Sequence, residues 1–226
     1  MSKAPNDSAL PQLVIFDLDG TILDSSQAMR DSFERAFRKV VPNAQTIPFH
    51  EVQARQGIAF REIVSEMSWP PILAEAFTEE NIKNISANQL YPGVKEALEG
   101  LSRNGILLGL CTGKDRARTL LLLRELGLSG LFHAIVCGDD PCPGKPAPDG
   151  LQKIISETHS DTDFSLFVGD SRVDWLAAAN AGMRFLAVRW PDQVTTSIAS
   201  ELCPRIDGSD LVRRLRSGDF SCLISC

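Results

Sequence analysis

Short apolar runs and amphipathic stretches alternate along most of the chain. The first run, Leu13–Phe16, has only apolar residues, which is typical of a strand buried on both faces of a parallel sheet. Similar runs predict further strands at Ile106–Cys111, Phe132–Cys137, Phe164–Val168 and Arg184–Val188. Helical patterns between and after them predict helices ending at Asn104 and covering 115–126, 148–158, 172–180 and Ser209–Leu215. This alternation predicts an α/β fold, with a Rossmann-like parallel sheet and helices on both faces.

The segment from residue 22 to residue 90 has a different pattern. Phe33 and Phe37 recur at helical spacing behind a capping sequence at residues 24–26, and further helices are expected over 58–67 and 72–87. No strand pattern interrupts them. We therefore expect an all-helical cap domain inserted into the α/β core. The expected division is a disordered tail at 1–11, a core domain at 12–21 and 91–226, and a cap domain at 22–90.

Two carboxylates, Asp17 and Asp19, follow the first predicted strand, and Gly20 allows the chain to turn sharply after them. Ligands of open α/β sheets bind at the carboxyl ends of the strands. Buried carboxylates need a cationic partner, and Mg²⁺ prefers oxygen ligands of this kind. Taken alone, the pair fits an ordinary acidic turn equally well.

Three more strand ends carry polar residues. Thr112 and Gly113 precede a helix and offer a hydroxyl and backbone N–H groups to a phosphate, or they simply cap that helix. Lys145 lies in a proline-rich loop that would hold its ammonium in place. Asp170 and Asp174 are one helical turn apart, so both can face one point. Alternatively, Asp170 simply caps the helix and Asp174 is favourable in its first turn. Because a parallel sheet brings these strand ends together, we expect one site for a cation and a phosphate.

Composition narrows the function classes. The 226 residues allow one large domain with an insertion, and the net charge of −6 argues against nucleic acid as a partner. No apolar run reaches transmembrane length, and the first eleven residues lack the apolar core of a signal peptide. The six cysteines are irregularly spaced and indicate neither a zinc site nor a disulfide framework. We expect a cytoplasmic protein, monomeric or homodimeric, with no nucleic-acid or membrane partner.

Four sequence motifs resemble those of the haloacid dehalogenase-like hydrolase superfamily, over about residues 13 to 190. They are Asp17-Leu18-Asp19-Gly20-Thr21, Thr112-Gly113-Lys114, Lys145-Pro146 and Gly169-Asp170-Ser171-x-x-Asp174. The helical segment after the first motif resembles the cap of the phosphoglycolate phosphatase-like branch. The resemblance implies a hydrolase with this fold.

By this resemblance, Asp17 is the nucleophile and forms an aspartyl-phosphate. Asp19 protonates the leaving alcohol and then activates the attacking water. Asp17, the backbone carbonyl of Asp19 and Asp170 are expected to hold Mg²⁺, and Asp174 to bind it or orient its ligands.

The second and third motifs are assigned to the phosphate, again by resemblance. Thr112 and the Gly113 N–H would hold phosphate oxygens, and Lys145 would balance the charge. In the predicted cap, Arg55 and Gln56 lie beside a glycine turn and are candidates for binding the rest of the substrate.

The function that the motifs imply is a Mg²⁺-dependent phosphatase for a small phosphorylated metabolite, such as phosphoglycolate or a sugar phosphate. The alternatives are a β-phosphoglucomutase-like phosphosugar mutase and a catalytically silent binding protein on the same fold. Mutases of that type commonly carry an Arg near position 60 and a His in the first cap helix. Here Phe60 occupies the position and the first cap helix has no His, which favours water as the phosphate acceptor.

Overall fold

The computed structural model describes residues 11–191 and 205–217. The tail predicted at 1–11 therefore lies, except for Pro11, outside the described residues. A six-stranded sheet forms the centre of the core, with the order β5-β4-β1-β6-β7-β8 and parallel pairing throughout. Its strands are β1 (Leu13–Phe16), β4 (Leu107–Cys111), β5 (Ala134–Val136), β6 (Ser165–Gly169), β7 (Arg184–Arg189) and β8 (Arg205–Asp207). The expected placement of β1 between β4 and β6 is confirmed.

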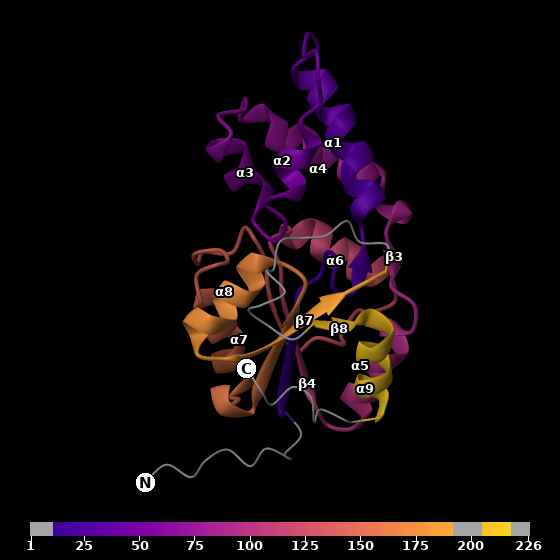
Figure 1. Cartoon of the computed structure of the whole chain (residues 1–226), viewed down its shortest axis with the longest axis vertical. Helices are drawn as coiled ribbons and strands as arrows, with labels where there is room; N and C mark the ends of the chain where they lie inside the picture. Colours follow the sequence, from indigo (N-terminus) through magenta and orange to yellow (C-terminus); the bar gives the residue numbers. More distant parts are fainter. Residues whose placement is uncertain (1–10, 192–204, 218–226) are drawn as a thin grey trace.

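Helices cover both faces of this sheet (Figure 1). The helices of the core are α5 (Val94–Arg103), α6 (Arg116–Glu125), α7 (Asp149–Thr158), α8 (Arg172–Ala181) and α9 (Gly208–Ser217). Val14 and Phe16 pack into the apolar cluster that contains residues of α5, α6 and α9, whereas Leu13 and Ile15 pack into the cluster on the α7 and α8 side. Successive side chains of a strand point to opposite faces, so burial on both faces requires the uninterrupted apolar run.

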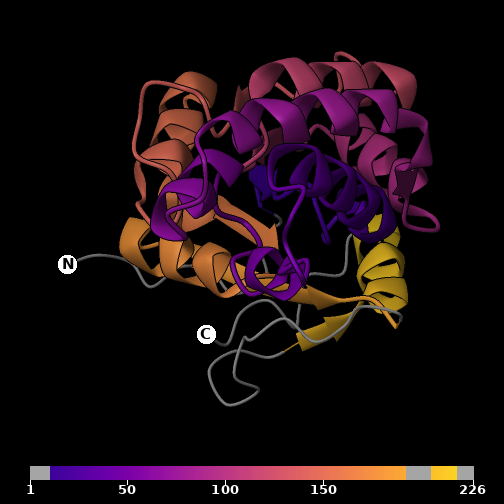
Figure 2. The ribbon, with the colours of Figure 1, turned by 90° about the horizontal axis from the view of Figure 1, so that it is seen from above.

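Four helices from the segment 22–90 form a separate layer over the carboxyl ends of the strands, seen from above in Figure 2. They are α1 (Ser26–Val40), α2 (Phe49–Gln53), α3 (Phe60–Glu66) and α4 (Ile72–Lys83), followed by a 3₁₀ turn at Ile85–Ala87. This layer has an apolar cluster of its own, in which Phe33 contacts the rings of Phe37, Phe49, Phe60 and Trp69.

The ends of this segment depart from the all-helical expectation. β2 (Leu23–Asp24) pairs antiparallel with β3 (Gln89–Leu90), so a two-stranded ribbon joins the helical layer to the core. The chain enters the helical layer through β2 and leaves it through β3. Pairing of these two segments satisfies backbone groups that would otherwise lack partners. Two-residue strands are too short to show alternation in the sequence. The helical prediction holds for the body of the segment.

Other elements were also missed because they are short. β8 has three residues, α2 has five, and a 3₁₀ turn covers Thr162–Phe164. The strand expected at Phe132–Cys137 is confined to Ala134–Val136. No helix in the described part of the chain is long and apolar enough to cross a membrane.

The ring of Phe33 is fully buried at the centre of the helical layer, so its removal should destabilise that layer. We expect Phe33→Ala to lower the free energy of unfolding by about 3–5 kcal/mol, measured by chemical denaturation. Ile72→Ala, at a residue that is 54% exposed, is the matched control and should change it by at most about 0.5 kcal/mol. Equal effects of the two substitutions would contradict this account of the layer.

Candidate active site

Three buried carboxylates meet at the carboxyl edge of the sheet. Asp17 continues β1, with its N–H donating to the Val168 carbonyl at 2.9 Å, while Asp170 follows β6 and Asp174 lies in the first turn of α8. Asp17, Asp170 and Asp174 are at most 3% exposed. One oxygen from each lies within 4.8 Å of the others. The structure thus brings together the acids of the first and fourth motifs.

The Lys145 ammonium lies between two of these acids. Its Nζ donates to Asp17 Oδ1 at 2.6 Å and to Asp174 Oδ1 at 2.5 Å, and it also reaches the Cys111 carbonyl at 3.3 Å. Burial opposes the charged form of this lysine, but the two carboxylates outweigh burial and raise the pKa of Lys145. Lys145 is therefore a fixed cation of the site, as the proline-rich loop predicted, and not a solvated loop residue.

Asp174 also caps its own helix. Its Oδ2 accepts hydrogen bonds from the Ser171 N–H at 3.0 Å and the Ser171 hydroxyl at 2.5 Å, and the Ser171 side chain in turn caps α8. The sequence left open whether this acid faces the site or only stabilises the first turn of its helix. It does both, with one oxygen for each task. Because the cap holds Oδ2, the carboxylate is fixed with Oδ1 directed toward Lys145.

The charges of this cluster do not balance. Burial, together with the neighbouring Asp174, raises the pKa of Asp17 to about 7 against the opposing effect of Lys145. Burial and the charges of Asp17 and Asp174 raise the pKa of Asp170 well above its ordinary value. Carboxylates crowded in a low-dielectric site favour a bound cation. A set of buried oxygen donors with excess negative charge suits Mg²⁺, so the residues fit the metal that the motifs predicted.

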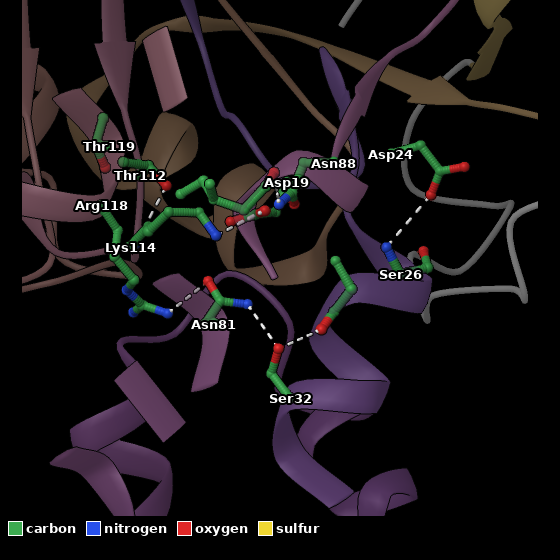
Figure 3. Close-up of polar contacts among 12 residues, drawn as sticks. Asp19, Asp24, Ser26, Ser32, Asn81, Asn88, Thr112, Lys114, Arg118 and Thr119 are labelled. Carbon is green, nitrogen blue, oxygen red and sulfur yellow. Dashed lines mark hydrogen bonds and ion pairs between the residues drawn. The ribbon is translucent and has the colours of Figure 1, made fainter. Parts of the chain in front are cut away.

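Asp19 contributes to the site through two different groups. Its carboxylate is not part of the acidic cluster and instead forms an ion pair with Lys114, with 3.1 Å between Oδ1 and Nζ (Figure 3). Its backbone carbonyl accepts a hydrogen bond from Gln56 Nε2 at 3.2 Å. Only the carbonyl is therefore placed near the expected metal ligands, and the carboxylate lines the adjoining cavity.

Gln56 connects the cap to the acidic cluster. Its Nε2 also donates to Asp170 Oδ2 at 2.9 Å. Gly20 makes this contact feasible: it has a φ of +85°, and a Cβ there would lie 2.2 Å from Asp170 Oδ2 and 2.5 Å from Gln56 Nε2. Gln56, which the sequence offered as a substrate-binding candidate, thus reaches a predicted metal ligand.

The second motif lies directly beneath the cap. Thr112 is buried, and its hydroxyl accepts a hydrogen bond from the Lys114 N–H at 3.2 Å. A Cβ at Gly113 would lie 2.7 Å from the Gly57 carbonyl oxygen, so only glycine allows the core loop and the cap turn to approach this closely. Thr112 and Gly113 both line the cavity that contains Asp17.

A cavity of about 50 Å³ lies between the cap and the core. Apolar cap residues form one side of it, namely Met29, Val52, Ile58, Phe60, Ile63 and Phe77. Core residues form the other side, namely Asp17, Asp19, Thr112, Gly113, Lys114 and Arg118. Since one water needs roughly 10–15 Å³, this cavity has room for a few waters. A larger cavity of about 660 Å³ adjoins it and shares Phe60, Gly113 and Arg118 with it.

The cation expected from the cap is already paired. Arg55 borders the cavity, but it forms ion pairs with Glu51 at 2.7 Å and Glu66 at 3.1 Å. These pairs within the cap neutralise the charge that made Arg55 a candidate for binding an anion.

Two buried cations on the core side were not foreseen. Lys114 pairs with Asp19, and Arg118 pairs with Asp115 while its Nη1 donates to Asn81 Oδ1 at 3.1 Å, linking α6 to the cap (Figure 3). The only signal for Lys114 is its place in the second motif. Arg118 is one of two arginines in the first turn of α6, and the sequence does not show which of them is buried.

Known proteins resemble this chain in sequence and in fold. The profile of the haloacid dehalogenase-like hydrolases matches residues 14–188, and the chain belongs to this family. A phosphoglycolate phosphatase from Agrobacterium fabrum is 32% identical over 79% of this chain and 81% of its own. Phosphoglycolate phosphatase 1 from Pseudomonas aeruginosa is 32% identical over 85% of this chain and 74% of its own.

A solved haloacid dehalogenase-like hydrolase from Bacteroides fragilis has a TM-score of 0.72 and 26% identity, covering 87% of this chain and 95% of that one. Together these matches confirm the family, its phosphoglycolate phosphatase-like branch and the class of enzyme, a phosphatase, that the motifs predicted.

The raised pKa values predict how stability depends on pH and on Mg²⁺. The folded protein holds the Asp17 proton more tightly than the unfolded chain, so without a divalent cation the free energy of unfolding should fall as pH rises from 3.8 to about 7. Mg²⁺ binds the ionised acids and should raise the thermal midpoint strongly at about pH 8 and weakly at about pH 5.

Asp170→Asn should remove most of this Mg²⁺-dependent increase, measured by differential scanning calorimetry. Asp163→Asn is the matched control, because Asp163 is exposed at the amino end of β6, away from the cluster. An unchanged increase in the Asp170 variant would show that the metal binds elsewhere.

Proposed function

We propose that this protein is a Mg²⁺-dependent phosphatase that hydrolyses a small phosphomonoester through an aspartyl-phosphate at Asp17. The observation that carries the proposal is the position of Asp17, whose carboxylate joins the acidic cluster, contacts the Lys145 ammonium and borders the cavity. A nucleophile, a fixed cation and a cation-binding set of oxygens thus meet beside a space for the substrate.

In the first step an oxygen of Asp17 attacks phosphorus, and the bond from phosphorus to the leaving oxygen breaks. Asp19, whose carboxylate lines the same cavity, gives its proton to that oxygen. In the second step Asp19 takes a proton from water, which attacks the phosphorus of the aspartyl-phosphate and regenerates Asp17. Lys145 holds Asp17 in position and offsets negative charge in both steps.

The proposed Mg²⁺ would be held by Asp17, the Asp19 carbonyl and Asp170, and it would reduce repulsion between the phosphate and the Asp17 carboxylate. Thr112 and the Gly113 N–H would hold phosphate oxygens, as both line the cavity beside Asp17. Gln56, in this account, contacts the metal site and not the leaving group.

The substrate we favour is a phosphorylated compound with a small leaving group, and phosphoglycolate is the first to examine. The relatives from Agrobacterium fabrum and Pseudomonas aeruginosa are phosphoglycolate phosphatases.

The cap wall favours a phosphatase over a phosphosugar mutase. Phe60 packs against Phe77, with 4.0 Å between ring centroids and the rings tilted by 34°, and it also contacts Phe33, so it belongs to the apolar cluster of the cap. A mutase must bind its sugar in a second orientation, so that a sugar hydroxyl and not water accepts the phosphoryl group. An apolar wall has no polar groups with which to bind the sugar in that orientation. The complete set of buried acids argues against a silent binding protein, because burying them without chemistry or metal is costly.

We further propose that residues 22–90 act as a cap domain that closes over the site, with the core domain formed by 12–21 and 91–226. The apolar cluster of the helical layer and the two-stranded ribbon beneath it support this division. The cytoplasmic location, the monomer or homodimer, and the lack of nucleic-acid and membrane partners stay predictions of the sequence.

Asp17→Asn keeps the size of the side chain but removes its nucleophilic charge. We expect turnover of phosphomonoesters to fall by at least about 1000-fold, measured as released inorganic phosphate, while phosphoglycolate still binds. Beryllofluoride should bind the native protein at Asp17 and not the variant. Asp163→Asn is the control and should turn over normally. Undiminished turnover by the Asp17 variant would overturn the proposal.

Hexose phosphates test whether water or a sugar hydroxyl accepts the phosphoryl group. We expect native protein with Mg²⁺ to release phosphate from small esters and to leave glucose 1-phosphate unisomerised, as followed by ³¹P NMR. A requirement for a bisphosphorylated sugar as activator would favour the mutase.

A further inference from the structure

Two cations are buried on the core wall of the cavity. The side chain of Lys114, just before α6, is 5% exposed, and that of Arg118, in the first turn of the helix, is 6% exposed. Burial lowers the pKa of Lys114, and the neighbouring Arg118 lowers it further. Burying two cations close together is costly unless anions face them. The partners of each cation therefore show how much of its charge is already compensated.

The two cations differ in how fully they are paired. Arg118 forms an ion pair with Asp115, donates to Asn81 at 3.1 Å and lies over the ring of Phe77. Lys114 has one ionic partner among the described residues, Asp19, at 3.1 Å. An ammonium has three N–H donors, so Lys114 can still donate to a ligand in the cavity.

The position of Lys114 indicates which part of a substrate it would meet. It lies against Asp19, which in the proposed function gives its proton to the leaving oxygen. Lys145, by contrast, lies at Asp17 on the phosphate side. On the leaving-group side the cap contributes an apolar wall and Arg55, whose charge is balanced by two glutamates. Lys114 is therefore the cation best placed to meet the leaving group.

We propose that Lys114 is a specificity-determining residue that binds an anionic group on the leaving part of the substrate, a carboxylate within a few bonds of the ester oxygen. Arg118 supports it by adding positive charge to the same wall and by joining that wall to the cap through Asn81. The inference rests on the proposed function and narrows its substrate class to phosphorylated small acids.

Two esters that differ only in this group test the inference. Phosphoglycolate carries a carboxylate where 2-hydroxyethyl phosphate carries a neutral alcohol. For the native protein kcat/KM should favour phosphoglycolate. Lys114→Met removes the charge and should reduce the ratio of the two kcat/KM values by about 10- to 100-fold, as expected for a lost charged hydrogen bond. Lys114→Arg keeps the charge and should restore most of the ratio.

Arg124→Met is the matched control, since Arg124 is a cation of α6, the helix that follows Lys114, and its side chain is 69% exposed. It should leave the ratio unchanged. Calorimetry on the Asp17→Asn background gives a second readout without turnover, in which Lys114→Met should weaken phosphoglycolate binding by a similar factor.

The outcomes separate the inference from the proposed function. Equal losses for both esters in Lys114→Met would show that Lys114 acts only by positioning Asp19, and would overturn the inference while leaving the phosphatase intact. A native protein that hydrolyses neither ester nor other phosphomonoesters would overturn the proposed function. Calorimetry would then still decide whether Lys114 binds the carboxylate.

Discussion

The Lys145 ammonium, held between Asp17 and Asp174, is the contact on which the site depends. It joins a loop to the first and fourth motifs, which are far apart in the sequence. Removing a cation from such a buried group leaves carboxylates that repel one another in a medium of low dielectric. Because Lys145 compensates only part of the negative charge, a second cation would stabilise the cluster further. The excess of negative charge that destabilises this edge of the sheet suits it to a metal ion, which would in turn offset the charge of a phosphate.

The cap meets this edge through a few close polar contacts. Gln56 reaches the Asp19 carbonyl and Asp170, Gly113 lies against the turn at Gly57, and Arg118 donates to Asn81. Asp17, Asp170 and Lys114 are buried beside these contacts, and burial strengthens the electrostatic interactions between them. The cap packs around its own apolar cluster. Through these contacts its polar side chains also bind charged groups of the core.

Sequence patterns predicted the core well because its elements obey simple periodicities. The apolar run of β1 follows from burial on both faces, and parallel topology then places Asp17 and Asp170 at the same edge of the sheet, on strands that pair with each other. The ribbon of β2 and β3 was missed because two-residue strands carry no periodic signal. Lys114 was not assigned a role, since nothing in the sequence shows that its side chain is buried. Arg55 drew attention as a cap cation. Its partner Glu51 lies only four residues earlier, whereas its second partner, Glu66 in α3, becomes evident only in the folded cap.

The central claim is that Asp17 becomes covalently phosphorylated during turnover. The most direct measurement is a rapid acid quench of native protein turning over a phosphomonoester with Mg²⁺, followed by peptide mass spectrometry. The account predicts a phosphoryl group on the peptide that contains Asp17, assigned to Asp17 and not Asp19 by fragmentation. Phosphate released at full rate with no phosphorylated peptide at any quench time, or with the phosphoryl group on another residue, would contradict it.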